Sequence, residues 1–119
     1  MATMNLGAEN FERTVTSNEI VFVDFWASWC GPCRMFAPVY ERAAAAHPDI
    51  VFGKVNTEAE QAIAAAAQIT SIPTLMAFKG GTLVFSQPGA LPAAALEDVI
   101  TTIRDLDLEA ALAEQKQSA

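Results

Sequence analysis

The feature that most constrains the fold is a pair of cysteines, Cys30 and Cys33, which are separated by only two residues. Residues 20–25, just before them, form a nearly continuous apolar run, which is typical of a strand covered on both faces. Residues 34–47, just after them, have the periodicity of a helix. The sequence therefore predicts a dithiol at the junction of a buried strand and a helix, a position suited to redox chemistry.

Composition and charge argue against several functional classes. The chain has 119 residues, 52% of them hydrophobic and 18% charged, which fits one globular domain. It carries 14 Asp and Glu residues against 7 Lys and Arg residues, and this acidity disfavours binding to nucleic acid or to anionic lipid. The apolar runs are too short for a membrane span and no N-terminal signal pattern is present, so a cytoplasmic location is expected.

Strand and helix patterns alternate along the chain. Strands are expected at residues 4–6, 20–25, 50–55, 74–78 and 82–85, and helices at residues 8–15, 34–47, after Thr57 and after Pro92. Gly80 and Gly81 predict a tight hairpin, because a primed turn needs positive φ at both central residues. The predicted fold is α/β, with a central mixed sheet of four to five strands flanked by about four helices on both faces.

Two finer expectations concern the third helix and the C-terminus. Thr57 and Glu60 have the spacing of a capping box, so the third helix is expected to begin at Thr57. Small residues on its inner stripe suggest that it lies close to the sheet. Residues 107–119 are expected to be a helical extension or a frayed tail, with fraying from Lys116 onward.

The spacing of the cysteines assigns them different roles. Thiol–disulfide exchange needs one thiolate that attacks and a second thiol that resolves the mixed disulfide. Cys30, at the open end of the helix, faces unpaired backbone N–H groups that favour its thiolate, so it is the predicted nucleophile. Cys33, one turn further on, is the predicted resolving residue and is expected to be more buried. The alternative is a permanent structural disulfide or a pair of core cysteines.

The residues around the cysteines resemble the active-site signature of the thioredoxin family. The matching run is residues 26–33, Trp-Ala-Ser-Trp-Cys-Gly-Pro-Cys. The resemblance extends from about residue 4 to about residue 106 and includes Val23-Asp24-Phe25, Lys54, Ile72-Pro73-Thr74 and Gly89-Ala90. It implies the thioredoxin fold over residues 1–106.

Asp24 lies in the apolar strand before the cysteines, where an ionised carboxylate would be expensive. Desolvation is therefore expected to raise its pKa and to let it exchange protons near neutrality. The resemblance implies that Asp24 transfers a proton to and from Cys33, with Lys54 as a possible partner. The alternative is a carboxylate that simply pairs with Lys54.

The resemblance also implies a rim for substrate binding. A cis peptide bond before Pro73 would face the dithiol, and the Ile72 backbone would bind an extended substrate segment as an added strand. An ordinary trans proline is the alternative. Trp29 is expected to cover the active-site loop, which includes Gly31 and Pro32. The expected apolar patch consists of Trp29, Gly31, Pro32, Ile72, Gly89 and Ala90.

Other residues receive no catalytic role. His47 is expected to be a helix-end residue, and with the two cysteines it cannot complete a tetrahedral zinc site, so no metal is predicted. Three features depart from the family pattern and leave partner choice open: Gln87-Pro88 before Gly89, Asn56, and the long tail.

As a whole, the resemblance implies a protein-disulfide reductase without a bound cofactor. It would act on oxidised proteins as a monomer and receive electrons from NADPH through a flavoprotein thioredoxin reductase. Gly31-Pro32 argues against an oxidase or isomerase, because a thiolate-stabilising residue such as histidine between the cysteines makes the couple more oxidising. A thioredoxin-fold binding subunit, whose redox state is incidental, is the alternative from a different class.

Overall fold

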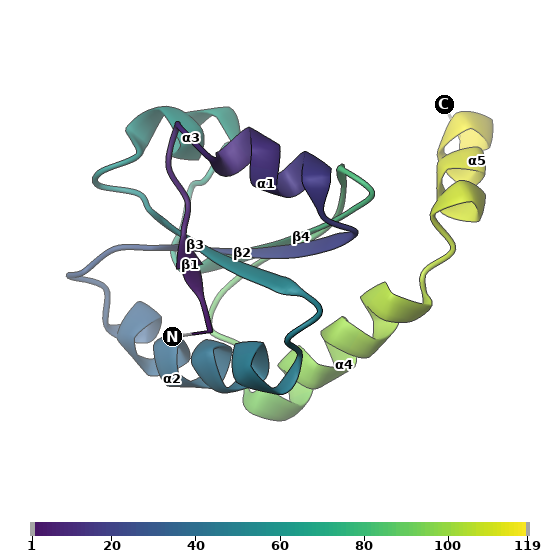
Figure 1. Ribbon diagram of the computed structural model, residues 1–119. Helices are drawn as coiled ribbons and strands as arrows, with labels where there is room; N and C mark the ends of the chain where they lie inside the picture. Colours follow the sequence, from purple (N-terminus) through teal and green to yellow (C-terminus); the bar gives the residue numbers. More distant parts are fainter. Residues whose placement is uncertain (1, 119) are drawn as a thin grey trace.

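Five strands form one mixed sheet in the order β1-β3-β2-β4-β5 (Figure 1). The computed structural model describes residues 2–118. The strands are β1 (Met4–Asn5), β2 (Ile20–Trp26), β3 (Val51–Asn56), β4 (Thr74–Lys79) and β5 (Thr82–Pro88). β3 is parallel to both β1 and β2, whereas β4 is antiparallel to β2 and β5. The predicted mixed sheet is confirmed.

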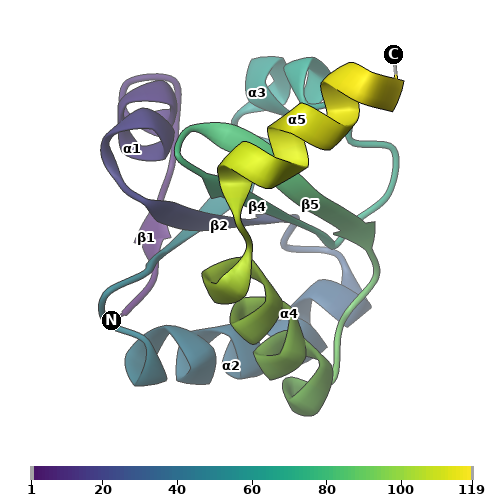
Figure 2. The same ribbon diagram turned by 90° about the vertical axis from the view of Figure 1, so that its right-hand side faces the viewer.

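Helices cover both faces of the sheet, as predicted. In Figure 1, α1 (Phe11–Ser17) and α3 (Gln61–Ala66) lie above the sheet, and α2 (Gly31–Ala46) and α4 (Ala93–Asp105) lie below it. Figure 2 shows α4 crossing α2 on this lower face. A fifth helix, α5 (Leu108–Ser118), follows α4 and stands beyond the end of the β4–β5 hairpin. Ala119 lies outside the described residues, and the expected fraying from Lys116 onward stays a prediction.

The central strand β2 is buried along almost its whole length, as its apolar sequence predicts. On the side of α2 and α4, Phe22 stacks on Phe52 of β3 with ring centroids 5.3 Å apart. Tyr40 of α2 is fully buried there, and its hydroxyl donates a hydrogen bond to the carbonyl oxygen of Gly53 at 2.8 Å. Burial raises the pKa of Tyr40 well above its usual value, so this donor keeps its proton. α2 is therefore held firmly against the sheet that leads into the cysteine motif.

The β4–β5 hairpin is confirmed, with φ of 58° at Gly80 and 78° at Gly81. β5 is longer than predicted, because Pro88 still pairs with Thr74 of β4. A proline is tolerated there because β5 is the edge strand of the sheet.

The predicted start of α3 at Thr57 is wrong. α3 begins at Gln61, and Glu60 precedes it without a side-chain capping bond. Thr57 instead donates two hydrogen bonds to the carbonyl oxygen of Trp26, from its N–H at 2.9 Å and its hydroxyl at 3.1 Å. The hydroxyl is used to join this turn to the end of β2, so it does not cap the helix.

The expectation that α3 lies close to the sheet is met only at Ile63, which packs against the core on that face of the sheet. No residue of α3 is fully buried, and a groove of about 520 Å³ separates the helix from the hairpin. Ala62, Ile63 and Ala66 line one side of this groove, and Phe11 and Leu83 contribute to the other. Alanine side chains are too short to fill the space, so the small residues produce an open groove instead of close packing.

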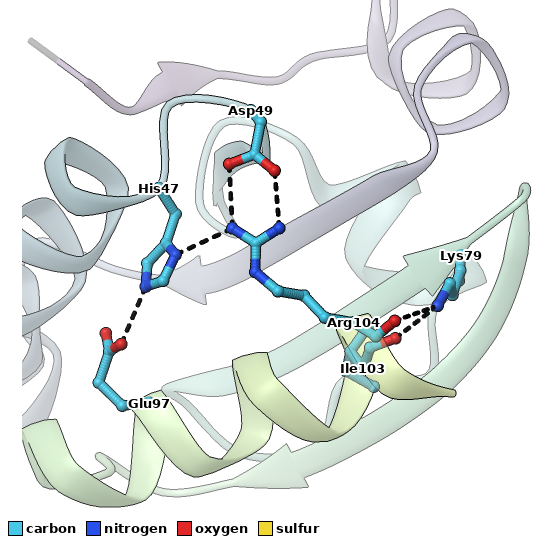
Figure 3. A network of polar contacts seen from close by, with 6 residues as sticks. All are labelled: His47, Asp49, Lys79, Glu97, Ile103 and Arg104. Carbon is cyan, nitrogen blue, oxygen red and sulfur yellow. Dashed lines mark hydrogen bonds and ion pairs between the residues drawn. The ribbon is translucent and has the colours of Figure 1, made fainter. Parts of the chain in front are cut away.

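A polar network joins the C-terminal end of α2 to α4 (Figure 3). Arg104 makes a bidentate ion pair with Asp49, at 2.6 and 2.9 Å, and donates to Nδ1 of His47 at 3.0 Å. Because Nδ1 accepts, the ring proton of a neutral His47 lies on Nε2, which donates to Glu97 at 2.9 Å. His47 is the C-cap residue of α2, so its predicted place at a helix end is confirmed.

The C-terminal end of α4 is capped by Lys79, at the end of β4. Its ammonium group donates to the carbonyl oxygens of Ile103 at 2.7 Å, Arg104 at 3.0 Å and Leu106 at 2.8 Å. Lys79 is buried, and these carbonyls lie where the helix dipole is negative. The ammonium group therefore fixes the point at which the chain leaves α4 for α5.

Candidate active site

Cys30 and Cys33 form a disulfide at the N-terminal end of α2, with their Cα atoms 5.2 Å apart. Cys30 is the N-cap residue, and its sulfur accepts a hydrogen bond from the backbone N–H of Cys33 at 3.2 Å. This N–H would otherwise lack a partner, because the first N–H groups of a helix have no carbonyl to bind. The same group can stabilise a thiolate on Cys30 after reduction.

The two cysteines are almost equally buried in this disulfide form, so the expectation that Cys33 is the more buried thiol stays a prediction for the reduced protein. Cys30 is 4% exposed and Cys33 is 3% exposed, because both pack against Ala27 and the partly buried Trp26 and Ile72. The asymmetry is one of hydrogen bonding, since the sulfur of Cys30 is the one that accepts an N–H.

Asp24 is 1% exposed, and neither carboxyl oxygen has a hydrogen-bond partner among the described residues. Burial raises its pKa from 3.8 to about 7, although the nearby positive charge of Lys54 opposes this shift. The predicted direction and cause are both found. An acid with this pKa can give or accept a proton near neutrality.

Lys54 pairs with Asp24 in the strand register, but it makes no hydrogen bond to the carboxyl group. The alternative of a direct Asp24–Lys54 ion pair is therefore wrong. The Lys54 ammonium lies 5.0 Å from the centre of the Trp26 ring, a cation–π distance. Lys54 thus acts on Asp24 through the electric field only.

The peptide bond between Ile72 and Pro73 is cis, as the resemblance implied. The carbonyl oxygen of Ile72 lies 3.8 Å from the sulfur of Cys30. On the other side, the N–H of Gly89 donates to the carbonyl oxygen of Pro73 at 2.7 Å, and Gly89 has a φ of 99°. The predicted rim residues Ile72, Pro73 and Gly89 are therefore adjacent in space to the disulfide or to one another.

Apolar residues close in sequence to the disulfide or to the cis-proline rim are exposed. Trp29 is 67% exposed, and Pro32, Gly89 and Ala90 are also exposed, whereas Gly31 is half-buried. Met35, two residues after Cys33, is 75% exposed and was not among the predicted apolar residues. Its signal in the sequence is its position off the buried stripe of α2, which contains Cys33, Phe36 and Tyr40.

Two other structural features bear on the class of protein. Within residues 2–118, no cluster of three or more His, Cys, Asp or Glu side chains is placed to hold a metal ion. Over the same residues, every helix is too short or too polar to cross a membrane.

Comparisons with known proteins agree with this geometry. The family model described as Thioredoxin matches residues 2–102. A protein of Streptomyces coelicolor named "Putative thioredoxin 2" is 57% identical, over 99% of this chain and 90% of its own length. A thioredoxin of Alicyclobacillus acidocaldarius is 45% identical, over 81% of this chain and 92% of its own. The solved thioredoxin of Plasmodium falciparum superposes with a TM-score of 0.78 at 34% identity, covering 84% of this chain and 97% of its own.

Proposed function

Since this chain belongs to the thioredoxin family and is a thiol–disulfide oxidoreductase, we propose that it reduces disulfides in other proteins through the Cys30–Cys33 pair. The observation that carries the proposal is the disulfide at the start of α2, in which the sulfur of Cys30 accepts the N–H of Cys33. That contact gives the two sulfurs unequal environments, as directional exchange requires.

The reaction has two exchange steps. In the reduced protein, the Cys30 thiolate attacks one sulfur of a substrate disulfide, forms a mixed disulfide and releases the other substrate sulfur as a thiolate. The Cys33 thiolate then attacks the sulfur of Cys30, which forms the Cys30–Cys33 bond and releases the second substrate thiolate. The substrate gains two electrons and the protein loses two.

Asp24 is proposed to accept the proton of Cys33 when the mixed disulfide is resolved. Its pKa of about 7 supports this role, because a base near that value is partly ionised at neutral pH. We expect Asp24→Asn to slow turnover while the alkylation rate of Cys30 stays largely unchanged. Turnover that is the same in both proteins from pH 6 to 9 would contradict the proposed proton transfer.

Substrate docking is proposed at the exposed apolar surface beside the disulfide. Trp29, Pro32 and Ala90 supply contact area, and the backbone of Ile72 binds an extended substrate segment next to Cys30. Gly31 keeps the loop free of a side chain, and Pro73 with Gly89 holds the opposite side of the rim.

The proposed electron source is NADPH, delivered by a flavoprotein thioredoxin reductase. This partner returns the Cys30–Cys33 disulfide to the dithiol after each reaction. The protein is proposed to act as a monomer. Its proposed location is a reducing compartment such as the cytoplasm, where the cycle runs in the direction of substrate reduction.

Insulin reduction tests this proposal directly. With NADPH and a thioredoxin reductase, the parent protein should precipitate insulin, and Cys30→Ser should abolish the activity. Cys33→Ser should instead accumulate a mixed disulfide through Cys30, which mass spectrometry identifies. Undiminished partner binding by Cys30→Ser, with no trapped adduct from Cys33→Ser, would favour a binding subunit.

A rate measurement tests the asymmetry between the cysteines. In the reduced protein, Cys30 should react with iodoacetamide at pH 7 faster than Cys33, because only its sulfur accepts a helix N–H. Equal rates at the two thiols would contradict the assignment of Cys30 as the nucleophile.

A further inference from the structure

The loop between β2 and the disulfide is tied down by two side chains from outside it. Ser28, in this loop, donates its hydroxyl to a carboxylate oxygen of Glu58 at 3.0 Å and its backbone N–H to the same oxygen at 3.4 Å. The carbonyl oxygen of Ser28 accepts a hydrogen bond from Arg34 at 2.9 Å. All the polar groups of Ser28 are therefore engaged by charged side chains, which make stronger hydrogen bonds than neutral ones.

The Glu58 side chain extends from a turn that is itself anchored. Its own backbone N–H donates to the side-chain oxygen of Asn56 at 2.9 Å, at the end of β3. The preceding residue, Thr57, donates two hydrogen bonds to the carbonyl oxygen of Trp26, at the end of β2. Glu58 therefore links the β3–α3 turn by hydrogen bonds to the loop around Ser28, 30 residues earlier in the chain.

The hydrogen bonds to Ser28 lie next to residues that are proposed to contact a substrate protein. Ser28 immediately precedes Trp29, whose side chain is 67% exposed, and it stands two residues before Cys30. Arg34 binds Ser28 from the first turn of α2, on the far side of the cysteine motif. The Ser28–Trp29 segment is thus held from both β3 and α2 although both of its residues are exposed.

We infer that Glu58, with Arg34, positions the Ser28–Trp29 segment for docking of an oxidised protein and so acts as a positioning residue for disulfide exchange. The inference rests on the proposed reductase function. A loop that is already ordered loses less conformational entropy when a partner binds, so the anchor favours binding of a large substrate. The sulfur of Cys30 keeps its contact with the N–H of Cys33, so its reaction with a small reagent does not depend on the anchor.

The test compares three variants in insulin reduction. Glu58→Ala removes the acceptor, and Glu58→Gln keeps an oxygen that can accept from Ser28. Glu60→Ala removes an equal charge from the same turn, at a carboxylate that accepts from Ala8 instead. We expect Glu58→Ala to raise the KM for insulin about threefold to tenfold with kcat within about twofold, the range that loss of such hydrogen bonds allows. Glu58→Gln should recover most of this loss, and Glu60→Ala should behave as the parent.

A second measurement reports the anchor itself. Hydrogen exchange at the Ser28 amide should accelerate in Glu58→Ala and remain unchanged in Glu60→Ala, because the Ser28 N–H donates to Glu58. The alkylation rate of Cys30 by iodoacetamide should stay within about twofold of the parent in every variant.

The outcomes are distinguishable. A parent protein that reduces no protein disulfide contradicts the proposed function, and the inference falls with it. An active parent with an unchanged KM in Glu58→Ala contradicts the inference alone, as does an unchanged Ser28 exchange rate. An equal rise in KM in Glu58→Gln or in Glu60→Ala shows that charge, and not the hydrogen bonds to Ser28, governs docking.

Discussion

The polar groups before and after α2 differ in whether they have hydrogen-bond partners. Before the helix, in β2, both carboxyl oxygens of Asp24 and the indole nitrogen of Trp26 are buried without a hydrogen-bond partner among the described residues. At the C-terminal end, the polar network of His47, Asp49, Glu97 and Arg104 is joined by hydrogen bonds and ion pairs (Figure 3). The strand before the cysteine motif thus holds an unpaired buried acid, whereas the residues after α2 take part in a paired surface cluster.

The difference shows which carboxyl group can gain or lose a proton near neutral pH. A buried carboxyl group without a partner has a raised pKa, so it can change its protonation state near neutral pH. A carboxylate held by a guanidinium has a lowered pKa, as at Asp49, where the hydrogen bonds from Arg104 lower the value to about 2. Asp49 stays ionised throughout the physiological pH range. It therefore binds Arg104 of α4 to the turn after α2 and is not suited to proton transfer.

The largest expected effect is on the pH dependence of stability at Asp24. The folded protein holds this proton up to about pH 7, whereas the unfolded chain releases it near pH 3.8. Between these values the folded state binds more protons, so the free energy of unfolding falls as pH rises, by at most about 4 kcal/mol. Asp24→Asn should abolish this decline and be more stable than the parent at pH 8, by about 2 kcal/mol, since its amide remains unpaired.

Urea unfolding of the oxidised protein at several pH values between 4 and 8.5 measures this effect. The parent and the variant should diverge most above pH 7. Parallel pH profiles for the two proteins would show that Asp24 is not an isolated buried acid, and the contrast between the ends of α2 would lose its basis.

The next largest effect is expected at Lys79, which caps α4. Lys79→Met keeps the aliphatic stem but removes the ammonium donor from the carbonyl oxygens of Ile103, Arg104 and Leu106, of which Ile103 keeps the N–H of Leu106. We expect a loss of about 2 kcal/mol, because buried acceptors lose a charged donor. Denaturant unfolding measures it, and Arg13→Met, at an exposed cation of α1, provides the control. A loss below about 0.5 kcal/mol would mean that other groups satisfy these carbonyls.

A smaller effect is expected for Arg104→Gln. Both partners of the Arg104–Asp49 pair are accessible to solvent, so its contribution to stability is small and should vanish in high salt. The pKa of Asp49 should rise from about 2 toward its ordinary value, which a carboxyl NMR titration measures. In the parent, the contribution of the pair is present above about pH 4 and is lost as pH falls toward 2. A pKa that stays near 2 in Arg104→Gln would assign the shift to another cause.

The smallest effect is expected on turnover from His47→Asn. His47 lies at the far end of a 16-residue helix, roughly 24 Å along its axis from the cysteines. Insulin reduction by this variant should match the parent at pH 6 and pH 8. A changed pH profile of turnover would indicate that the two ends of α2 are coupled.

The sequence predicts the buried acid before α2, but it predicts little of the polar network after α2. Asp24 stands out because it is the only polar residue in an apolar strand, and burial follows from the strand being central. The partners of His47 and Arg104 are 50 and more residues apart, and no local pattern pairs them. Lys79 gives no signal either, because a lysine at a strand end is ordinarily exposed.

Local signals failed where a tertiary contact competed for the same group. Thr57 and Glu60 have the spacing of a capping box, yet the Thr57 hydroxyl binds Trp26 and the helix begins at Gln61. The role of Glu58 depends on the approach of two turns that only the folded sheet brings together. The signature around Cys30 was readable because its chemistry depends on a spacing of three residues along one helix turn.

The Lys79 cap on α4 bears on where a second protein domain or a solid support can be joined to the chain. It directs α5 away from the sheet, on the side of the molecule opposite the N-terminal end of α2 (Figure 1). A protein domain or a solid support joined after α5 would therefore leave the disulfide open to large substrates. Attachment through the C-terminal side is thus the geometry of choice for an immobilised reductant or for capturing trapped substrates from solution.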